Sequence, residues 1–150
     1  MAGLILARGG SQGIPLKNLA PLRGRPLLEW ALGAMINFGN FDSLWVSTDH
    51  PGIATCASAY GVQVFARSAK FACSEAASVD AVNEFLLSHP EVDVVALVQC
   101  TSPFIRPGKA RGFFEYQVEY ERVRAAFFCA SIDRVSSELM LEVSLYYQCS

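Results

Sequence analysis

The sequence predicts an α/β fold, a three-layer sandwich built on a mostly parallel sheet. Short apolar runs alternate with longer segments of helical character through the first two thirds of the chain. That alternation is typical of β-α-β units, whose crossover connections make neighbouring strands parallel. Residues 92–99 are apolar at most positions without alternation. Such a run is expected of a strand that helices cover on both faces.

Five strands and four helices are expected from these runs. The strands are predicted at residues 3–7, 43–48, 62–66, 92–99 and 125–131. The helices are predicted at residues 26–38, 51–60, 77–88 and 108–122. Residues 133–150 are rich in apolar side chains but show neither a cap nor a partner strand, so they receive no assignment.

Helix-boundary residues support two of the helices. Pro26 and Pro51 suit the first helical turn, where a missing N–H costs nothing. Gly39 and Gly61 suit the positions just after a helix. Asp49 stands where a side chain would cap the helix that begins at Pro51, and we expect it to do so.

Size, charge and cysteine content limit the class of protein. One domain fits 150 residues, of which 52% are hydrophobic and 17% charged. The net charge of −2 and the scattered Lys and Arg argue against nucleic-acid binding, and no apolar run is long enough for a membrane span. Five cysteines without a C-x-x-C spacing predict buried free thiols rather than a zinc site. We therefore expect a soluble, intracellular protein.

The loop after the first predicted strand has the composition of a phosphate-binding loop. The apolar run ends at Arg8, and three glycines, Ser11 and Lys17 follow within nine residues. Glycines let the backbone approach a phosphate closely, and the cations neutralise its charge. The alternative is an ordinary turn between a strand and a helix. The gathering of these residue types at one strand end favours a phosphate-bearing ligand.

Polar residues also follow the other predicted strands. Because ligands bind at the carboxyl ends of parallel strands, these residues are expected to share one rim. They are Arg8, Ser11, Gln12, Lys17, Asn18, Ser47, Thr48, Asp49, His50, Arg67, Ser68, Gln99, Thr101, Ser102 and Arg106. Arginines bind phosphate or carboxylate, while amides and hydroxyls bind sugar hydroxyls. The rim suits a nucleoside triphosphate and a polyhydroxylated, carboxylated second substrate. No Ser/His/Asp set is defensible, and His89 is expected simply to end a helix.

Four segments together resemble the N-acylneuraminate cytidylyltransferases, with the greatest likeness to animal members. They are residues 4–18, 26–30, 45–50 and 99–103, which occur in the order and spacing of that family. The resemblance implies a Rossmann-like fold of the nucleotide-diphospho-sugar transferase type. It also implies an enzyme of amino-sugar metabolism that transfers CMP from CTP to the anomeric hydroxyl of a sialic acid, with Mg²⁺ as cofactor and pyrophosphate as product.

The resemblance assigns substrate-binding residues position by position. Those expected to hold the CTP phosphates and ribose are Arg8, Ser11, Lys17 and Asn18, with Gln12 standing where the family has Lys. Those expected around the cytosine are Arg67, Ala76 (through its backbone) and Ser78. Gln99 and Thr101 would face the sialic acid. No metal ligand and no catalytic residue is assigned, because the active-site arginine and the metal-binding aspartates of the family have no counterpart before Ser150.

The departures from the family pattern lead to three expectations. Gln12 removes one positive charge from the triphosphate site, which predicts weaker CTP binding or slower transfer. Residues 1–150 are expected to be the N-terminal portion of a cytidylyltransferase domain, without its C-terminal part and dimer-forming insertion. The chain alone is therefore expected to be catalytically incomplete. The family implies a homo-oligomer and a nuclear location, with the cytoplasm as the alternative, since no basic import cluster is present.

Three other interpretations remain open. Residues 9–14 also resemble the glycine loop of NAD(P)-binding short-chain dehydrogenases, although Arg8, Pro15 and the lack of a Tyr-x-x-x-Lys pair oppose that assignment. The related bacterial Kdo cytidylyltransferases are a second alternative, which residues 13–18 disfavour. The third is a non-catalytic fragment that binds nucleotide or pairs with a full-length subunit through its apolar tail.

Overall fold

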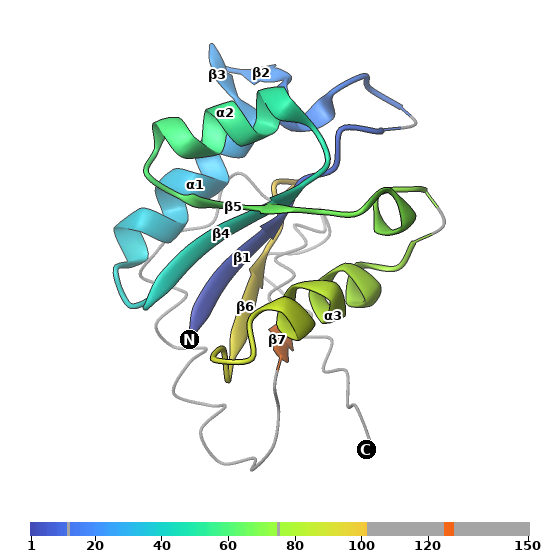
Figure 1. The fold of residues 1–150 in the computed structure, drawn as a ribbon. Coiled ribbons are helices and arrows are strands. Elements are labelled where there is room, and N and C mark those ends of the chain that lie inside the picture. Colours follow the sequence, from blue (N-terminus) through green and yellow to red (C-terminus); the bar gives the residue numbers. More distant parts are fainter. Residues whose placement is uncertain (12, 75, 102–124, 128–150) are drawn as a thin grey trace, which may run out of the picture.

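The computed structural model describes residues 1–11, 13–74 and 76–101, together with the backbone of residues 125–127. Within these residues the chain forms a five-stranded sheet of order β5-β4-β1-β6-β7 and a separate two-stranded hairpin, β2-β3 (Figure 1). All four pairings in the larger sheet are parallel. The predicted mostly parallel α/β fold is confirmed.

The strands of the large sheet are short, and the residues of β1 and β6 are almost all buried. They are β1 (Ala2–Leu6), β4 (Ser43–Thr48), β5 (Gln63–Ala66), β6 (Val95–Val98) and β7 (Ala125–Phe127). β1 lies at the centre, where Leu4 pairs with Trp45 of β4 and with Leu97 of β6. Helices cover both faces of this central strand, which explains its continuous apolar sequence.

Three helices form the outer layers: α1 (Leu27–Phe38), α2 (Pro51–Ala59) and α3 (Ser78–Ser88). One buried cluster joins the Ile5 face of β1 to side chains of α1 and α2. A second cluster joins the Leu4 face to Phe85 of α3. Successive strand residues point to opposite faces, so the same short strand serves both cores. Figure 1 shows α1 and α2 lying together, with α3 separate from them. None of the described helices has the length and apolar character that crossing a membrane requires.

Most predicted elements are found, with small shifts at their ends. The strand expected at residues 92–99 begins only at Val95, because residues 89–92 form a turn in which the Val92 amide donates to the His89 carbonyl at 3.1 Å. The strand expected at 125–131 is observed at Ala125–Phe127, and the remainder lies outside the described residues. The helix expected at 108–122 and the unassigned residues 133–150 also lie outside them.

Two predictions at helix starts are wrong. Pro26 lies in strand β3 (Arg25–Pro26) and precedes α1 with an extended ψ of 141°, whereas Pro51 does occupy the first turn of α2. Asp49 does not cap α2. His50 takes that role, with its Nδ1 accepting the Gly52 amide at 3.1 Å. The predicted glycine positions are confirmed, since Gly39 and Gly61 both have φ of +71°.

The sequence did not indicate the hairpin formed by β2 (Pro21–Leu22) and β3. Its two turn residues, Arg23 and Gly24, have φ of +51° and +79°, as a type I′ turn requires. Two short 3-10 helices, η1 (Lys17–Leu19) and η2 (Ala69–Phe71), were also not anticipated.

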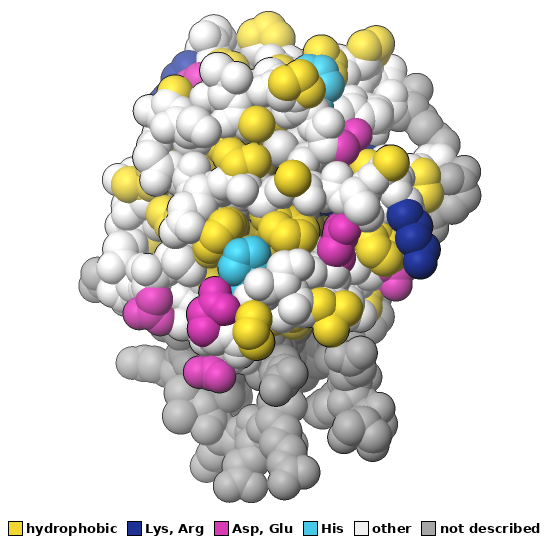
Figure 2. Space-filling model, viewed as in Figure 1, with side chains coloured by type: hydrophobic (Ala, Val, Ile, Leu, Met, Phe, Trp, Pro, Cys, Tyr) yellow, Lys and Arg dark blue, Asp and Glu magenta, His cyan; other side chains and the backbone are white. Residues whose placement is uncertain are grey.

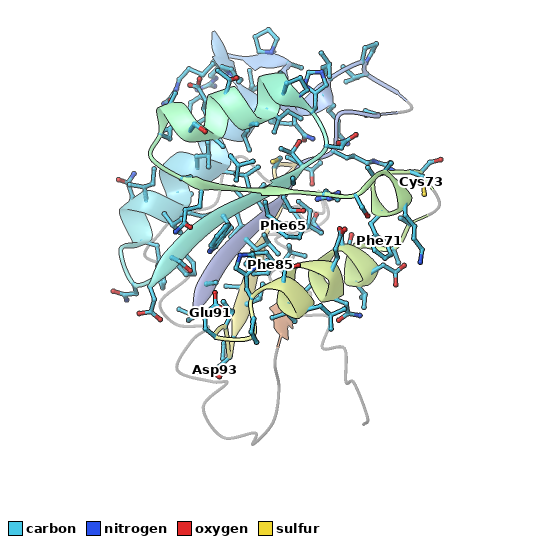
Figure 3. The ribbon with its side chains drawn as sticks, in the orientation of Figure 1. Phe65, Phe71, Cys73, Phe85, Glu91 and Asp93 are labelled. Atoms are coloured by element: carbon cyan, nitrogen blue, oxygen red, sulfur yellow. The ribbon has the colours of Figure 1, made fainter. Side chains whose placement is uncertain are left out.

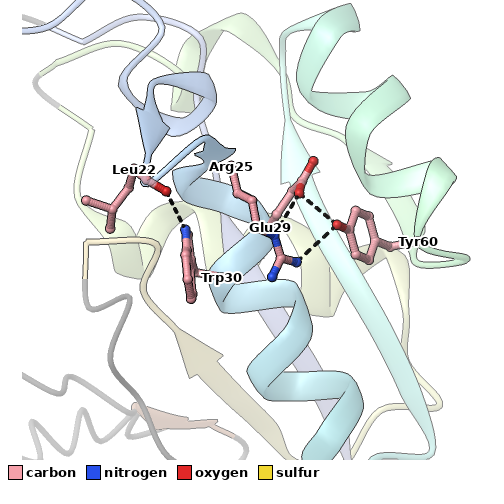
Figure 4. A network of polar contacts seen from close by, with 5 residues as sticks. All are labelled: Leu22, Arg25, Glu29, Trp30 and Tyr60. Carbon is pink, nitrogen blue, oxygen red and sulfur yellow. Dashed lines mark hydrogen bonds and ion pairs between the residues drawn. The ribbon is translucent and has the colours of Figure 1, made fainter.

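Polar contacts fasten the hairpin to the helices (Figure 4). Trp30 Nε1 donates to the Leu22 carbonyl at 3.1 Å, and the Arg25 guanidinium lies 5.1 Å from the Trp30 ring centroid. Arg25 also contacts Glu29 and Tyr60, and the Tyr60 hydroxyl donates to Glu29 at 2.7 Å. The network joins the hairpin to α1 and to the end of α2.

An aromatic cluster holds α3 against the sheet. Phe85 lies 5.4 Å from Trp45 and 5.5 Å from Phe65, ring centroid to centroid, in edge-to-face geometry. His89 stacks on Phe85 at 4.4 Å, and its Nδ1 lies 3.0 Å from the Phe85 carbonyl oxygen. The predicted role of His89 at a helix end is confirmed. Figure 3 shows Phe65 and Phe85 between β5 and α3.

Candidate functional site

A cavity of about 220 Å³ opens at the carboxyl ends of β1 and β6. Its walls come from the loop after β1, the first residue of α3 and the residues after β6. Seven of the predicted substrate-binding residues line it: Arg8, Ser11, Lys17, Asn18, Ser78, Gln99 and Thr101. The expectation that the strand ends share one rim is therefore met for these residues, which lie up to 93 positions apart in the sequence.

The loop after β1 is folded back on itself by Asn18. The Asn18 side chain is only 7% exposed, and its Nδ2 donates to the Arg8 carbonyl at 3.0 Å. This bond joins the first and last residues of the loop and brings Lys17 to the same cavity as Arg8. Leu16, just before η1, has a positive φ of 48°, which an apolar side chain rarely adopts. The backbone here is strained in a way that is typical of binding sites.

Asp49 has a different role from the predicted one, because it supports the glycine loop. Its Oδ1 accepts the Gly9 amide at 2.8 Å, across a separation of 40 residues. Thr48 Oγ1 accepts the His50 amide at 3.1 Å and so shapes the turn that presents Asp49. The carboxyl ends of β1 and β4 are thereby tied together beside the cavity.

Gly9 is required at its position by the closeness of His50. A Cβ added to Gly9 would lie 2.8 Å from His50 Cβ and 3.0 Å from its Cδ2, whereas a Cβ on Gly10 would meet nothing within 4 Å. We expect Gly9→Ala to displace the loop and to weaken ligand binding at the cavity by about 10-fold, from a loss on the order of 1–2 kcal/mol. Gly33→Ala in α1 is the matched control, because its Cβ would also meet nothing within 4 Å and it does not line the cavity; it is expected to bind within about twofold of the unmodified chain. Equal binding by both variants, measured by calorimetry, would contradict the steric argument.

Arg67 is a buried cation beside this site. It is 8% exposed, and Ser47 accepts two of its bonds: Nε donates to Oγ at 3.0 Å and Nη2 to the carbonyl at 2.8 Å. Burial lowers the pKa of the Arg67 guanidinium; the carboxylates of Asp49 and Glu84 act in the opposite direction, and Arg8 adds to the lowering.

Arg8 connects the two sides of the site. Its Nη1 donates to the carbonyl of Cys73, in the segment between η2 and α3. Ser78 begins α3 in the same region and lines the cavity. Of the residues predicted to surround cytosine, Arg67 is buried, Ala76 is half-buried, and neither lines the cavity as it stands.

The opposite wall follows β6. Thr101 Oγ1 donates to Gln99 Oε1 at 3.2 Å, so the two polar side chains predicted to face the second substrate contact each other. Between them, Cys100 is 3% exposed, and burial raises its thiol pKa to about 12. Cys100 is therefore an uncharged part of the wall. Among the described cysteines, Cys56, Cys73 and Cys100 are free; the expected burial holds for Cys100, whereas Cys56 is half-buried and Cys73 is exposed.

Some predicted residues are not placed. Gln12, Ser102 and Arg106 lie outside the described residues. Sequence reasoning missed the contact of Asp49 with the Gly9 amide and that of Glu84 with the Ser68 amide. Asp49 carried a signal, since it directly follows a strand, but the same position also suits a helix cap. Glu84 carried none, because it lies in the middle of a helix.

The described residues do not form a metal site of their own. No group of three or more His, Cys, Asp or Glu residues suited to holding a metal ion occurs in the described part of the chain. The described polar residues that line the cavity are cations, hydroxyls and amides, whereas Mg²⁺ requires oxygen ligands that include one or two carboxylates. On the face seen in Figure 2, Lys and Arg side chains are few and lie apart, so positive charge does not spread over that surface.

Comparison with known proteins gives the same fold and a family. An N-acylneuraminate cytidylyltransferase of Oncorhynchus mykiss is 49% identical over 107 residues, which are 71% of this chain and 25% of that protein. A solved CMP:2-keto-3-deoxy-manno-octonic acid synthetase complexed with CTP matches at a TM-score of 0.67 and 23% identity, covering 77% of this chain and 46% of that one. A solved manganese complex of a Mycobacterium tuberculosis protein matches at a TM-score of 0.50 and 23% identity. The match covers 76% of this chain and 57% of that one.

The chain spans about a quarter of the length of three curated N-acylneuraminate cytidylyltransferases that it matches at 46–49% identity. The cytidylyltransferase family model, in contrast, matches residues 2–140, nearly the whole chain. The glycine loop, the strand ends and the cavity between them all lie within that match. This protein belongs to the cytidylyltransferase family.

Proposed function

We propose that this chain binds CTP in the cavity at the ends of β1 and β6 and serves the transfer of CMP to a sialic acid. The observation that carries the proposal is the convergence of Arg8, Ser11 and Lys17 from one glycine-containing loop on that cavity. Two cations and a hydroxyl within a loop of this kind suit a triphosphate. The name of the Oncorhynchus mykiss relative, an N-acylneuraminate cytidylyltransferase, supports a sialic acid as the acceptor.

The transfer is an in-line displacement at the α-phosphorus of CTP. The anomeric oxygen of the sugar forms a new bond to that phosphorus and gives up its proton to solvent. The bond from phosphorus to the bridging oxygen breaks, and pyrophosphate leaves with the electron pair. Such a reaction depends mainly on positioning and charge neutralisation.

The described residues supply the positioning and part of the neutralisation. Arg8 and Lys17 would hold the phosphates, and Asn18 keeps both at one cavity by closing the loop. Arg67 and Ser78 would lie on the base side, and the Gln99–Thr101 pair would face the sugar acid. The described residues do not by themselves fit a Mg²⁺ site; the ion's ligands would include the phosphates themselves. The oligomeric state and compartment stay predictions.

Calorimetric titration with CTP tests the proposal, with NADP as the comparison ligand. Saturable heat from CTP and none from NADP is the expected result. Heat from NADP alone would overturn the proposal in favour of the dehydrogenase interpretation, although none of the matches described above is a dehydrogenase. If a folded chain gives no binding heat with either CTP or NADP, the proposal is also overturned. CTP binding without CMP-sialic acid product would favour the non-catalytic fragment.

Gln12→Lys is expected to tighten CTP binding. The added ammonium would extend the positive charge of the loop by one group, and a charged hydrogen bond to phosphate contributes about 1–3 kcal/mol. The expected gain in affinity is therefore roughly 5- to 100-fold. The measurement is the same titration, with Gln63→Lys on the exposed side of β5 as the control for net charge alone. If both substitutions leave CTP affinity unchanged, residue 12 has no role near the phosphates.

A further inference from the structure

One oxygen of the Glu84 carboxylate is buried without a hydrogen-bond partner. Among the described residues, Glu84 Oε2 is the buried side-chain atom left in that state. The other oxygen, Oε1, accepts the backbone amide of Ser68 at 3.1 Å. A buried acceptor without a partner is costly, and native structures contain few of them. The cost indicates that this carboxylate serves something other than the stability of α3.

The contact joins Glu84 to the residue that follows Arg67 in the chain. That residue is Ser68, and the Arg67 amide itself donates to the Thr48 carbonyl at 2.9 Å. The corner after β5 is therefore held on one side by β4 and on the other by Glu84. These two contacts fix the backbone from which the Arg67 side chain leaves.

The charge of Arg67 also needs a partner. The two acceptors that its guanidinium contacts both belong to Ser47, which is neutral. Asp49 and Glu84 are the two carboxylates whose fields oppose the effect of burial on Arg67, and Arg8 acts against them. Each carboxylate accepts one backbone amide, Asp49 from Gly9 and Glu84 from Ser68. Asp49 is exposed to solvent, whereas the second oxygen of Glu84 is buried without a partner, so the Glu84 charge is the less screened by water.

We propose that Glu84 is a positioning residue for Arg67, which it holds by fixing the Ser68 amide and by balancing the buried guanidinium charge. The two hydrogen bonds from that guanidinium to Ser47 use Nε and Nη2, and no hydrogen bond among the described residues uses Nη1. The inference rests on the proposed function, in which Arg67 lies on the base side of CTP. Glu84 thereby acts on base binding through Arg67 and does not itself contact the nucleotide.

Glu84→Gln separates the charge from the hydrogen bond. Its amide oxygen can still accept the Ser68 amide, but the negative charge is gone. We expect CTP affinity to fall about 10-fold, the size of one lost charged interaction, while affinity for inorganic tripolyphosphate stays within about twofold. Glu91→Gln is the matched control, because Glu91 is exposed and lies past the C-terminal end of α3 (Figure 3). It is expected to leave both affinities unchanged.

Glu84→Asp is expected to retain the CTP affinity that Glu84→Gln loses. It keeps the negative charge near Arg67, so CTP affinity is expected to stay within about threefold of the unmodified chain. This variant also carries the test if Glu84→Gln does not fold, as judged by circular dichroism. Equal losses of CTP and tripolyphosphate affinity in Glu84→Asp would then overturn the positioning role, whereas a loss confined to CTP would support the contact with the Ser68 amide as its basis.

The outcomes separate this inference from the proposed function. If the unmodified chain binds CTP and Glu84→Gln binds it equally well, the inference is wrong and the proposed function stands. Equal losses for CTP and tripolyphosphate would show a general structural effect and would also overturn the inference. If the unmodified folded chain does not bind CTP, the proposed function fails, and the inference fails with it.

Discussion

Replacing Arg8 with alanine is expected to weaken CTP binding by about 10- to 100-fold. A hydrogen bond between a charged side chain and a charged ligand contributes roughly 1.5–3 kcal/mol, and each 1.4 kcal/mol is a factor of ten in affinity. Arg8 leaves the carboxyl end of the central strand, lines the cavity, and is held there by the Cys73 carbonyl. Its guanidinium is therefore already placed before the ligand arrives.

Two further variants make the Arg8 experiment specific. Arg23→Ala removes the same charge from the exposed tip of the β2-β3 hairpin and is expected to change CTP affinity by less than about twofold. Arg8→Lys keeps the charge but loses the planar fork of donors, so an intermediate affinity is expected. Calorimetry with CTP measures all three. Similar losses for Arg8→Ala and Arg23→Ala would show that only net charge matters and would contradict a local phosphate site.

Replacing Phe85 with alanine is expected to lower the free energy of unfolding by about 3–5 kcal/mol. Phe85 is fully buried and lies in contact with aromatic rings from two strands and from His89. Truncation leaves a cavity that these rigid rings cannot close, and it removes the edge-to-face contacts as well. Because α3 carries Ser78 at its start and Glu84 further along, its packing also affects the candidate site.

Leu87→Ala is the matched control on the same helix. Leu87 is 85% exposed, so its truncation is expected to change the free energy of unfolding by less than about 0.5 kcal/mol. Urea denaturation followed by circular dichroism measures both variants. A loss below about 1 kcal/mol for Phe85→Ala would show that α3 contributes little to the cooperative core.

Local sequence was sufficient for the main elements of the sheet and its helices. Apolar runs such as 3–7 and 43–48 gave strands within a residue or two of their observed bounds, because short runs buried on both faces have few alternatives. The hairpin was not predicted, since its strands have only two residues each and contain two prolines. What stabilises it is contact with α1 and α2 through Trp30 and Glu29, and those contacts are invisible in the local sequence.

The candidate site was predictable in part, because the direction of the strands places some of its residues and tertiary contacts place the others. Parallel strands place their carboxyl ends at one edge, so strand direction alone was enough to expect Arg8, Lys17 and Gln99 together. The pattern could not distinguish residues that face the cavity from those that hold the others. Asn18 lines the cavity and also holds the Arg8 carbonyl. Asp49 accepts the Gly9 amide instead of capping a helix, and Arg67 donates to Ser47.

The sequence by itself therefore determined the α/β class, the order of most elements, the family resemblance and the rim on which the polar residues gather. The class, the order of the elements and the rim follow from periodicity and strand direction, whereas the family resemblance rests on the four segments 4–18, 26–30, 45–50 and 99–103. The tertiary structure alone decided that Asp49 accepts the Gly9 amide, that Arg67 is buried, and that Glu84 accepts the Ser68 amide with its other oxygen buried and unpaired. Each of these depends on residues 16 to 40 positions apart meeting in space, and hydrogen-bond partners at such separations are chosen by packing, not by neighbours in the chain.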